Sequence, residues 1–173
     1  MNLKPWMKYA LAALFVIGGI GAWFTRDLRQ IHGNLDRLRD LVSKSSDEQA
    51  IGGLIRAKEI SGCFAVPMTV ELGAPWPTFS DRDELAAAVH HARGMAKEIK
   101  VNIRNKTLKI AADRTTATMD LAAEAEVTMG RQSERDIREF RLQWVKQNGK
   151  WLIAKVEGRN TIRRPPGLGD SGY

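Results

Sequence analysis

The chain has 173 residues, of which 43% are hydrophobic, 27% charged and 7% aromatic. This balance excludes wholesale disorder and favours one domain of about 100–150 residues with an additional segment. The single cysteine, Cys63, excludes an intramolecular disulfide and any multi-cysteine metal or iron–sulfur site, and three histidines argue against a histidine-rich centre. We therefore expect no metal and no cofactor.

The net charge of +7 is concentrated at the two ends of the chain. Residues 1–44 hold seven Lys/Arg against three Asp/Glu, and residues 159–173 hold three against one, whereas residues 45–158 hold seventeen against sixteen. A nucleic-acid-binding domain carries its basic surplus on the folded unit itself. Here the N-terminal surplus flanks an apolar run, which indicates anionic lipid headgroups as a partner and no nucleic acid.

The apolar run extends from Tyr9 to Thr25 without a charged residue. As a helix it would rise about 25 Å, which approaches a bilayer core of about 30 Å once the residues just before it are included. Trp6 and Tyr9 mark one end and Trp23 marks the other, as in the aromatic belts of membrane helices. We predict a single transmembrane helix over 5–25, anchored by these three aromatic residues.

The alternative for this run is a cleaved signal peptide with Ala22 before the cut, but Ile20 and Trp23 fit such a site poorly. A short basic start before an apolar run is typical of an export signal, and long domains translocate largely regardless of charge. Four arginines between 26 and 39 place positive charge after the apolar run as well, so the positive-inside rule alone does not decide the orientation. We expect a single-pass protein of the cell membrane whose main domain is extracytoplasmic, in the periplasm of a bacterium.

An apolar row with spacing 3, 4, 3, 4 follows the membrane segment. This is the a/d seam of two heptads, so we predict an amphipathic helical stalk and linker over 26–45. The contact residues of this row are Leu28, Ile31, Leu35, Leu38 and Val42. Two interpretations stay open: the helix pairs with a partner or another copy, or it packs its stripe against its own domain. Two heptads are short for an isolated coiled coil, and Gly33 weakens the middle.

Two helices and a loop open the globular domain. Ser46 is the expected N-cap of the first helix, in a capping box with the glutamine three residues later, and this helix should end near Gly62. A proline-rich loop with a short strand at 68–72 comes next. Ser80 is the expected N-cap of the second helix and Gly94 its left-handed C-cap.

From residue 97 onward the apolar period changes to two, which indicates strands. The parity of the apolar positions flips after Asn105, and this predicts a β-bulge. Turns at Asp113-Arg114, around Gly130 and at Asn148-Gly149 separate three or four long antiparallel strands. The predicted fold class is α+β, with a curved antiparallel sheet packed on helices. The domain is assigned to residues 46–158 and a basic flexible tail to residues 159–173.

Four segments of the domain resemble the nuclear-transport-factor-two-like superfamily, also called polyketide-cyclase-like, whose fold is cystatin-like. They are the helix ending Arg56-Ala57-Lys58, the capped helix 79–85, the turn Asp113-Arg114-x-x-Ala117-Thr118 and the hairpin 140–153. The resemblance covers about residues 46–158 and includes no invariant catalytic signature. It implies a cone-like sheet wrapped over helices, often dimeric, with a pocket at its wide end.

Residue types in the domain argue against the acid–base chemistry that the resemblance allows. Enzymes of this superfamily that isomerise or dehydrate ring compounds typically combine a carboxylate with a tyrosine or histidine acid. Both tyrosines, Tyr9 and Tyr173, lie outside the domain, and His90 and His91 point about 100° apart on a helix. We assign no catalytic residue. The fold alone decides nothing, because the superfamily includes enzymes and non-enzymes.

Some side chains of the domain could line a pocket or contact a partner. Core packing is the alternative for the aromatic candidates, of which Trp76, between two prolines, is the one most expected at a rim. The candidates are Trp76, Phe79, His90, Arg138 and Trp144.

These observations favour a non-catalytic, membrane-anchored accessory or assembly subunit of a membrane protein complex. Its expected partners are membrane lipid and other subunits or further copies of the chain, bound through the helix, the stalk or the sheet face. The layout resembles that of type IV secretion assembly proteins, without a specific motif. The alternatives are a membrane-tethered small lyase or isomerase and a binder of apolar small molecules in the cone.

Overall fold

The computed structural model describes residues 25–74 and 76–161, in eight elements. In chain order they are a helix over 25–42, α2 (Ala50–Ser61), β1 (Phe64–Glu71), α3 (Arg82–Met95), β2 (Glu98–Ile110), β3 (Thr116–Met129), β4 (Gln132–Gln147) and β5 (Lys150–Thr161). The predicted anchor residues Trp6, Tyr9 and Trp23 lie outside the described residues, as does nearly all of the tail. Within the described ranges, no helix has the length and apolar composition needed to cross a bilayer.

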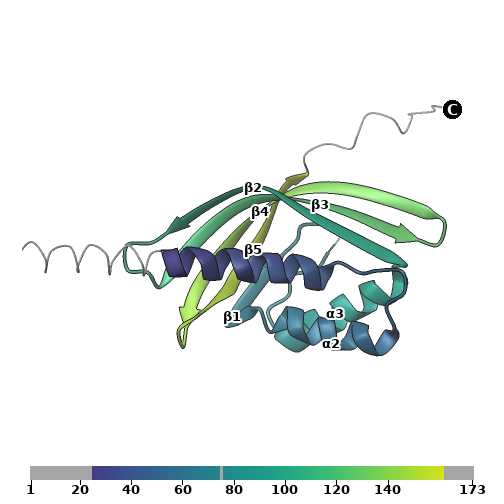
Figure 1. Ribbon diagram of the computed structural model, residues 1–173, viewed down its shortest axis with the longest axis horizontal. Coiled ribbons are helices and arrows are strands. Elements are labelled where there is room, and N and C mark those ends of the chain that lie inside the picture. The colour runs from purple at the N-terminus through teal and green to yellow at the C-terminus, as the bar shows by residue number, and fades with distance from the viewer. Residues whose placement is uncertain (1–24, 75, 162–173) are drawn as a thin grey trace, which may run out of the picture.

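Five strands form one curved sheet in the order β1-β5-β4-β3-β2 (Figure 1). The β2–β3, β3–β4 and β4–β5 pairs are antiparallel, as expected. The prediction of a wholly antiparallel sheet is wrong for β1, which runs parallel to β5 and makes the sheet mixed. Parallel neighbours need a long connection between them, and here α3 and three strands supply it. Sequence periodicity does not show which edge of the sheet β1 joins.

The helix over 25–42 lies along the concave face of the sheet, and α2 and α3 lie toward one end of the molecule (Figure 1). Ile31 and Leu35 are buried in the hydrophobic core, Leu38 and Val42 pack against it, and Leu28 is half-buried. Of the two interpretations left open, the structure shows the second: the helix packs its stripe inside its own domain. The boundary predicted at residue 46 therefore does not separate this helix from the core.

The predicted turns and the bulge of the sheet are confirmed. The β2–β3 register shifts between Arg104 and Thr107, and Asn105 has a φ of 54°. Arg114 has a φ of 56°, and Asn148 and Gly149 have φ values of 50° and 77°. Two successive residues with positive φ match the twist of a tight hairpin, which explains why an Asn-Gly pair connects β4 and β5.

The helix ends depart from the predicted caps. Helix α2 begins at Ala50, with Gln49 at the N-cap and no side-chain cap, so the predicted capping box at Ser46 is wrong. The N-cap of α3 is Asp81 rather than Ser80, because its carboxylate accepts the backbone N–H groups of Asp83 and Glu84. The predicted cap at Gly94 is also wrong, since this residue lies within α3. The expected end of the first helix at Gly62 is confirmed.

Candidate functional site

Arg93 of α3 fixes the segment that joins the helix over 25–42 to α2. Its side chain is buried and donates hydrogen bonds to the carbonyl oxygens of Leu41 and Val42 at 2.8 and 2.7 Å. It also contacts both carboxylate oxygens of Glu48, at 2.7 and 2.6 Å. Lys44 donates to the carbonyl oxygens of Arg93 and Ala96, near the end of α3. This network sets the position of α2 relative to the helix before it.

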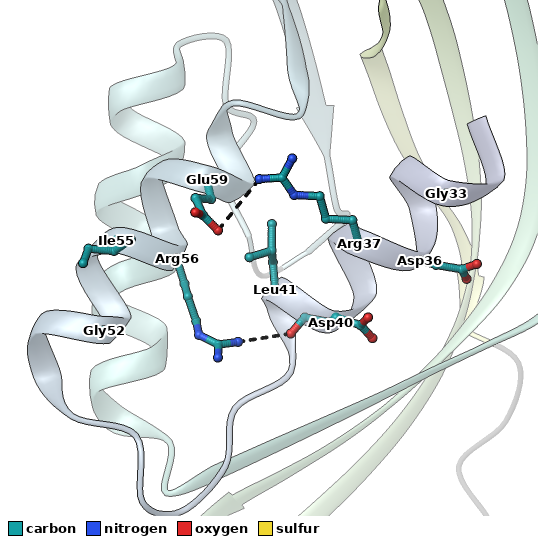
Figure 2. A pocket seen from close by; sticks show the side chains of 9 residues that line it. All are labelled: Gly33, Asp36, Arg37, Asp40, Leu41, Gly52, Ile55, Arg56 and Glu59. Carbon is teal, nitrogen blue, oxygen red and sulfur yellow. Dashed lines mark hydrogen bonds and ion pairs between the residues drawn. The ribbon is translucent and has the colours of Figure 1, made fainter. Parts of the chain in front are cut away.

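A cleft of about 610 Å³ lies between the helix over 25–42 and α2 (Figure 2). Arg37 and Glu59 face each other across it at 4.0 Å, and Arg56 donates to the carbonyl oxygen of Asp40 at 3.4 Å. The cleft therefore combines both signs of charge with two glycines and two apolar side chains. Its lining residues are Gly33, Asp36, Arg37, Asp40, Leu41, Gly52, Ile55, Arg56 and Glu59.

The two glycines leave the wall of this cleft open at the level of the backbone. A methyl group on Gly33 would meet no atom within 4 Å, and one on Gly52 would meet only the Glu48 side chain at 3.7 Å. Small residues on a helix surface let a second helix approach closely. At Gly33 the wall of the cleft is therefore bare backbone.

Next to the cleft, α2 exposes a row of large apolar side chains. Ile51, Leu54 and Ile55 are 74%, 47% and 56% exposed, whereas Ala57 and Ile60 of the same helix are buried. Residues three and four apart share one helix face, so the exposed three form a continuous strip. Contiguous exposed apolar side chains on a soluble fold mark an interaction site more often than isolated ones do.

A buried carboxylate lies at the other end of the helix over 25–42. Asp27 is only 5% exposed, and its Oδ1 accepts hydrogen bonds from Lys146 Nζ at 2.7 Å and Trp151 Nε1 at 3.0 Å. Burial alone would raise the pKa of Asp27, but these two hydrogen bonds and the positive charge of Lys146 together lower it. Lys146 also lies 5.5 Å from the centre of the Trp151 ring, a cation–π contact.

The five candidate site residues do not come together in one pocket. Trp144 and Phe79 are buried members of the hydrophobic core, and Trp76 is 50% exposed on the loop after β1. His90 is half-buried in α3, and its Nδ1 has no partner among the described residues. Arg138 of β4 donates to Asp136 at 2.6 Å and to the carbonyl oxygen of Leu72 at 3.2 Å.

Sequence reasoning missed Asp27, Lys146 and the Arg93–Glu48 pair. A signal was present for Asp27, since it precedes Ile31 and Leu35 by four and eight residues and so lies on the buried face of the helix. Arg93 carried no such signal, because a basic residue in the last turn of a helix is ordinarily explained by the helix dipole. Within the described ranges, no group of three metal-ligating side chains comes together.

No protein-family model and no curated protein matches the sequence. Solved structures do match. A "Putative Scytalone Dehydratase" from Novosphingobium aromaticivorans is 13% identical with a TM-score of 0.65, and the match covers 80% of this chain and 86% of that one. A protein with a cystatin-like fold from the same organism, described as similar to nuclear transport factor two, is 14% identical, with a TM-score of 0.64 over 81% and 85%.

A third structure, a "putative dehydratase" of the same fold family from Streptomyces avermitilis, is 9% identical, with a TM-score of 0.63 over 80% of this chain and 99% of that one. At these identities the likeness shows the fold alone. The matched structures share a cystatin-like α+β fold with this chain, and the fold that the resemblance implied is therefore confirmed.

Proposed function

We propose that this protein is a non-catalytic, membrane-anchored accessory subunit of a membrane complex. Its cleft and the apolar strip of α2 would bind an amphipathic helix of another subunit. The observation that carries the proposal is the row of Ile51, Leu54 and Ile55, which lies exposed beside an open cleft with charges of both signs. An amphipathic helix would bury this row and place its own charged residues against Arg56 and Glu59.

The inside of the fold supports binding at the surface rather than chemistry in the cone. Trp144, Trp151, Met119 and Ile153 are each at most 2% exposed, so large apolar side chains fill the middle of the concave face beneath the helix. The buried carboxylate, Asp27, has a lowered pKa and already accepts two hydrogen bonds. A carboxylate with a lowered pKa is a weak base and a poor proton donor at neutral pH.

Site-specific photocrosslinking in cells tests this proposal. A photoreactive amino acid at Ile55 should crosslink to one defined membrane protein, and the same probe at Met129 should not. Met129 is a matched control, because it is also apolar and 45% exposed but belongs to β3 and neither lines the cleft nor forms part of the α2 strip. The proposal predicts that Leu54→Asp abolishes the Ile55 crosslink and that the protein stays folded by circular dichroism. Equal crosslinking from both positions would contradict it.

An enzyme is the second candidate, because Asp27 is a buried acid beside a cation and two of the matched structures bear the name dehydratase. Asp27→Asn separates the two candidates, since it removes the charge with little change in shape. A binding subunit would keep its Ile55 crosslink and its biological function in this variant. A lyase would stay folded by circular dichroism but lose its function.

A further inference from the structure

Three segments that are far apart in the sequence meet at the end of the fold where the described helix begins. The start of the described helix and the β2–β3 and β4–β5 turns lie at this end, whereas α2, α3 and the β3–β4 turn lie toward the other (Figure 1). Contacts join the three segments: Lys146 Nζ is 2.7 Å from Asp27, and the Lys146 backbone N–H donates to the Thr115 carbonyl oxygen at 2.8 Å.

This end of the fold is basic although the domain as a whole is nearly neutral. Residues 25–30, 111–116 and 145–151 contain five basic and two acidic residues, whereas residues 95–99 and 127–134, at the opposite end, contain two of each. One of the two acids, Asp27, is buried against Lys146. Arg26, Arg29 and Lys150 are exposed and Arg114 is half-buried.

The chemistry of these side chains fits anionic phospholipid headgroups. Basic residues next to a membrane segment gain about 1 kcal/mol each near an anionic surface. The uncharged run Tyr9–Thr25 ends at this same face, so a bilayer that holds the run would lie within a few residues of Arg26 and Arg29. The β2–β3 and β4–β5 turns, which contain Arg114 and lead to Lys150, lie at the same end of the fold (Figure 1).

We infer that this basic end, made of Arg26, Arg29, Arg114 and Lys150, docks flat on anionic lipid headgroups and fixes the orientation of the domain. The inference rests on the membrane anchor of the proposed function. It adds that the cleft and the α2 strip lie toward the far end of the domain, where they can meet another subunit. The orientation follows from side chains of the folded domain and not from the anchor alone.

Hydrogen–deuterium exchange on the full-length protein tests this docking. The protein is reconstituted into vesicles of phosphatidylcholine alone or of phosphatidylcholine with phosphatidylglycerol. Amides of the turns at 111–115 and 147–150 should exchange at least about five-fold more slowly in the anionic vesicles. This factor corresponds to the gain of about 1 kcal/mol for one basic side chain near an anionic surface. Salt near 1 M should remove the difference in the wild type, because it shortens the Debye length to about 3 Å.

Two variants, each with basic residues replaced by glutamine, compare the basic end with the opposite end as a control. Replacing the four basic residues by glutamine should make exchange at both turns equal in the two lipids, whereas Lys97→Gln with Arg131→Gln, at the opposite end, should leave the protection unchanged. Equal exchange of the wild-type turns in both lipids, or protection that survives high salt, would overturn the docking. Protection of the same turns in detergent by an added oligonucleotide would overturn the choice of lipid. Release of the protein from both vesicles by alkaline carbonate would instead show that the anchor itself is wrong.

Discussion

Lys146 Nζ lies 2.7 Å from Oδ1 of Asp27, a residue 119 positions earlier in the chain. This pair joins the first helix of the described chain to β4, and Trp151 Nε1 completes it from β5 at 3.0 Å. Three elements that share no local sequence pattern are thereby held at one carboxylate. A second contact lies further along the same helix, where Asn34 donates to the Trp151 carbonyl oxygen at 2.8 Å. Together the two contacts fix the position of the helix along the concave face.

Asp27→Asn should lower stability at neutral pH by about 1.5–3 kcal/mol, the usual range for hydrogen bonds to a charged group. The pKa of Asp27 is lower in the folded state than its ordinary value of 3.8, so its contribution is complete above that value and is lost as the pH falls through the folded-state pKa. Urea unfolding at pH 7 and near pH 3 measures this: the gap between wild type and variant should narrow in acid. A gap that widens in acid would contradict the assignment.

Arg93→Met should cost about 3–5 kcal/mol, because it leaves the Glu48 carboxylate buried with less compensation and removes bonds to three backbone carbonyl oxygens. Arg56 also contacts Glu48, at 3.4 Å, but its side chain is 44% exposed, so Arg56→Met should cost at most about 1 kcal/mol. Denaturant unfolding of both variants measures the difference. Comparable losses in the two would show that burial does not distinguish these ion pairs.

Sequence periodicity predicted the strands from β2 onward because apolar residues recur at every second position along them, and turn chemistry predicted the hairpins. It failed at Ser46 for a tertiary reason. The Glu48 carboxylate contacts Arg93, 45 residues away, and α2 begins only at Ala50. Gln49, which the capping box would have placed in the first turn, is therefore itself the N-cap residue with an extended backbone. The sequence did not predict the parallel pairing of β1 with β5 either, because no local pattern shows which strand is the neighbour of β1.

The candidate site was harder to predict than the fold. Trp76 was expected at a rim, and its side chain is 50% exposed on the loop after β1. The strip of Ile51, Leu54 and Ile55 was not among the candidates, although the helix that carries it was expected. A helix with apolar residues on two faces does not reveal which face its own domain covers, because that depends on the packing of α2 against α3.

Gly158→Ala should destabilise the domain by about 1–3 kcal/mol, the usual range for overpacking. A methyl group at this position of β5 would lie 2.6 Å from the carbonyl oxygen of Leu72, and the backbone would have to move to accept it. The melting temperature of the purified variant measures the effect. An unchanged value would show that β5 and the segment after β1 are not in close contact.

Gly33→Ala and Gly94→Ala form a matched pair that separates stability from binding. Both glycines lie inside helices, and a methyl group on either would meet no atom within 4 Å. Each substitution should therefore stabilise the domain by about 0.5–1 kcal/mol, because alanine loses less backbone entropy than glycine in a helix. Only Gly33 lines the cleft, so only Gly33→Ala should reduce the crosslink from Ile55 to its partner. Thermal unfolding measures the first effect and crosslinking yield the second. A partner that crosslinks equally well to both variants would have to bind without entering the cleft, and the binding surface would then be confined to the apolar strip of α2.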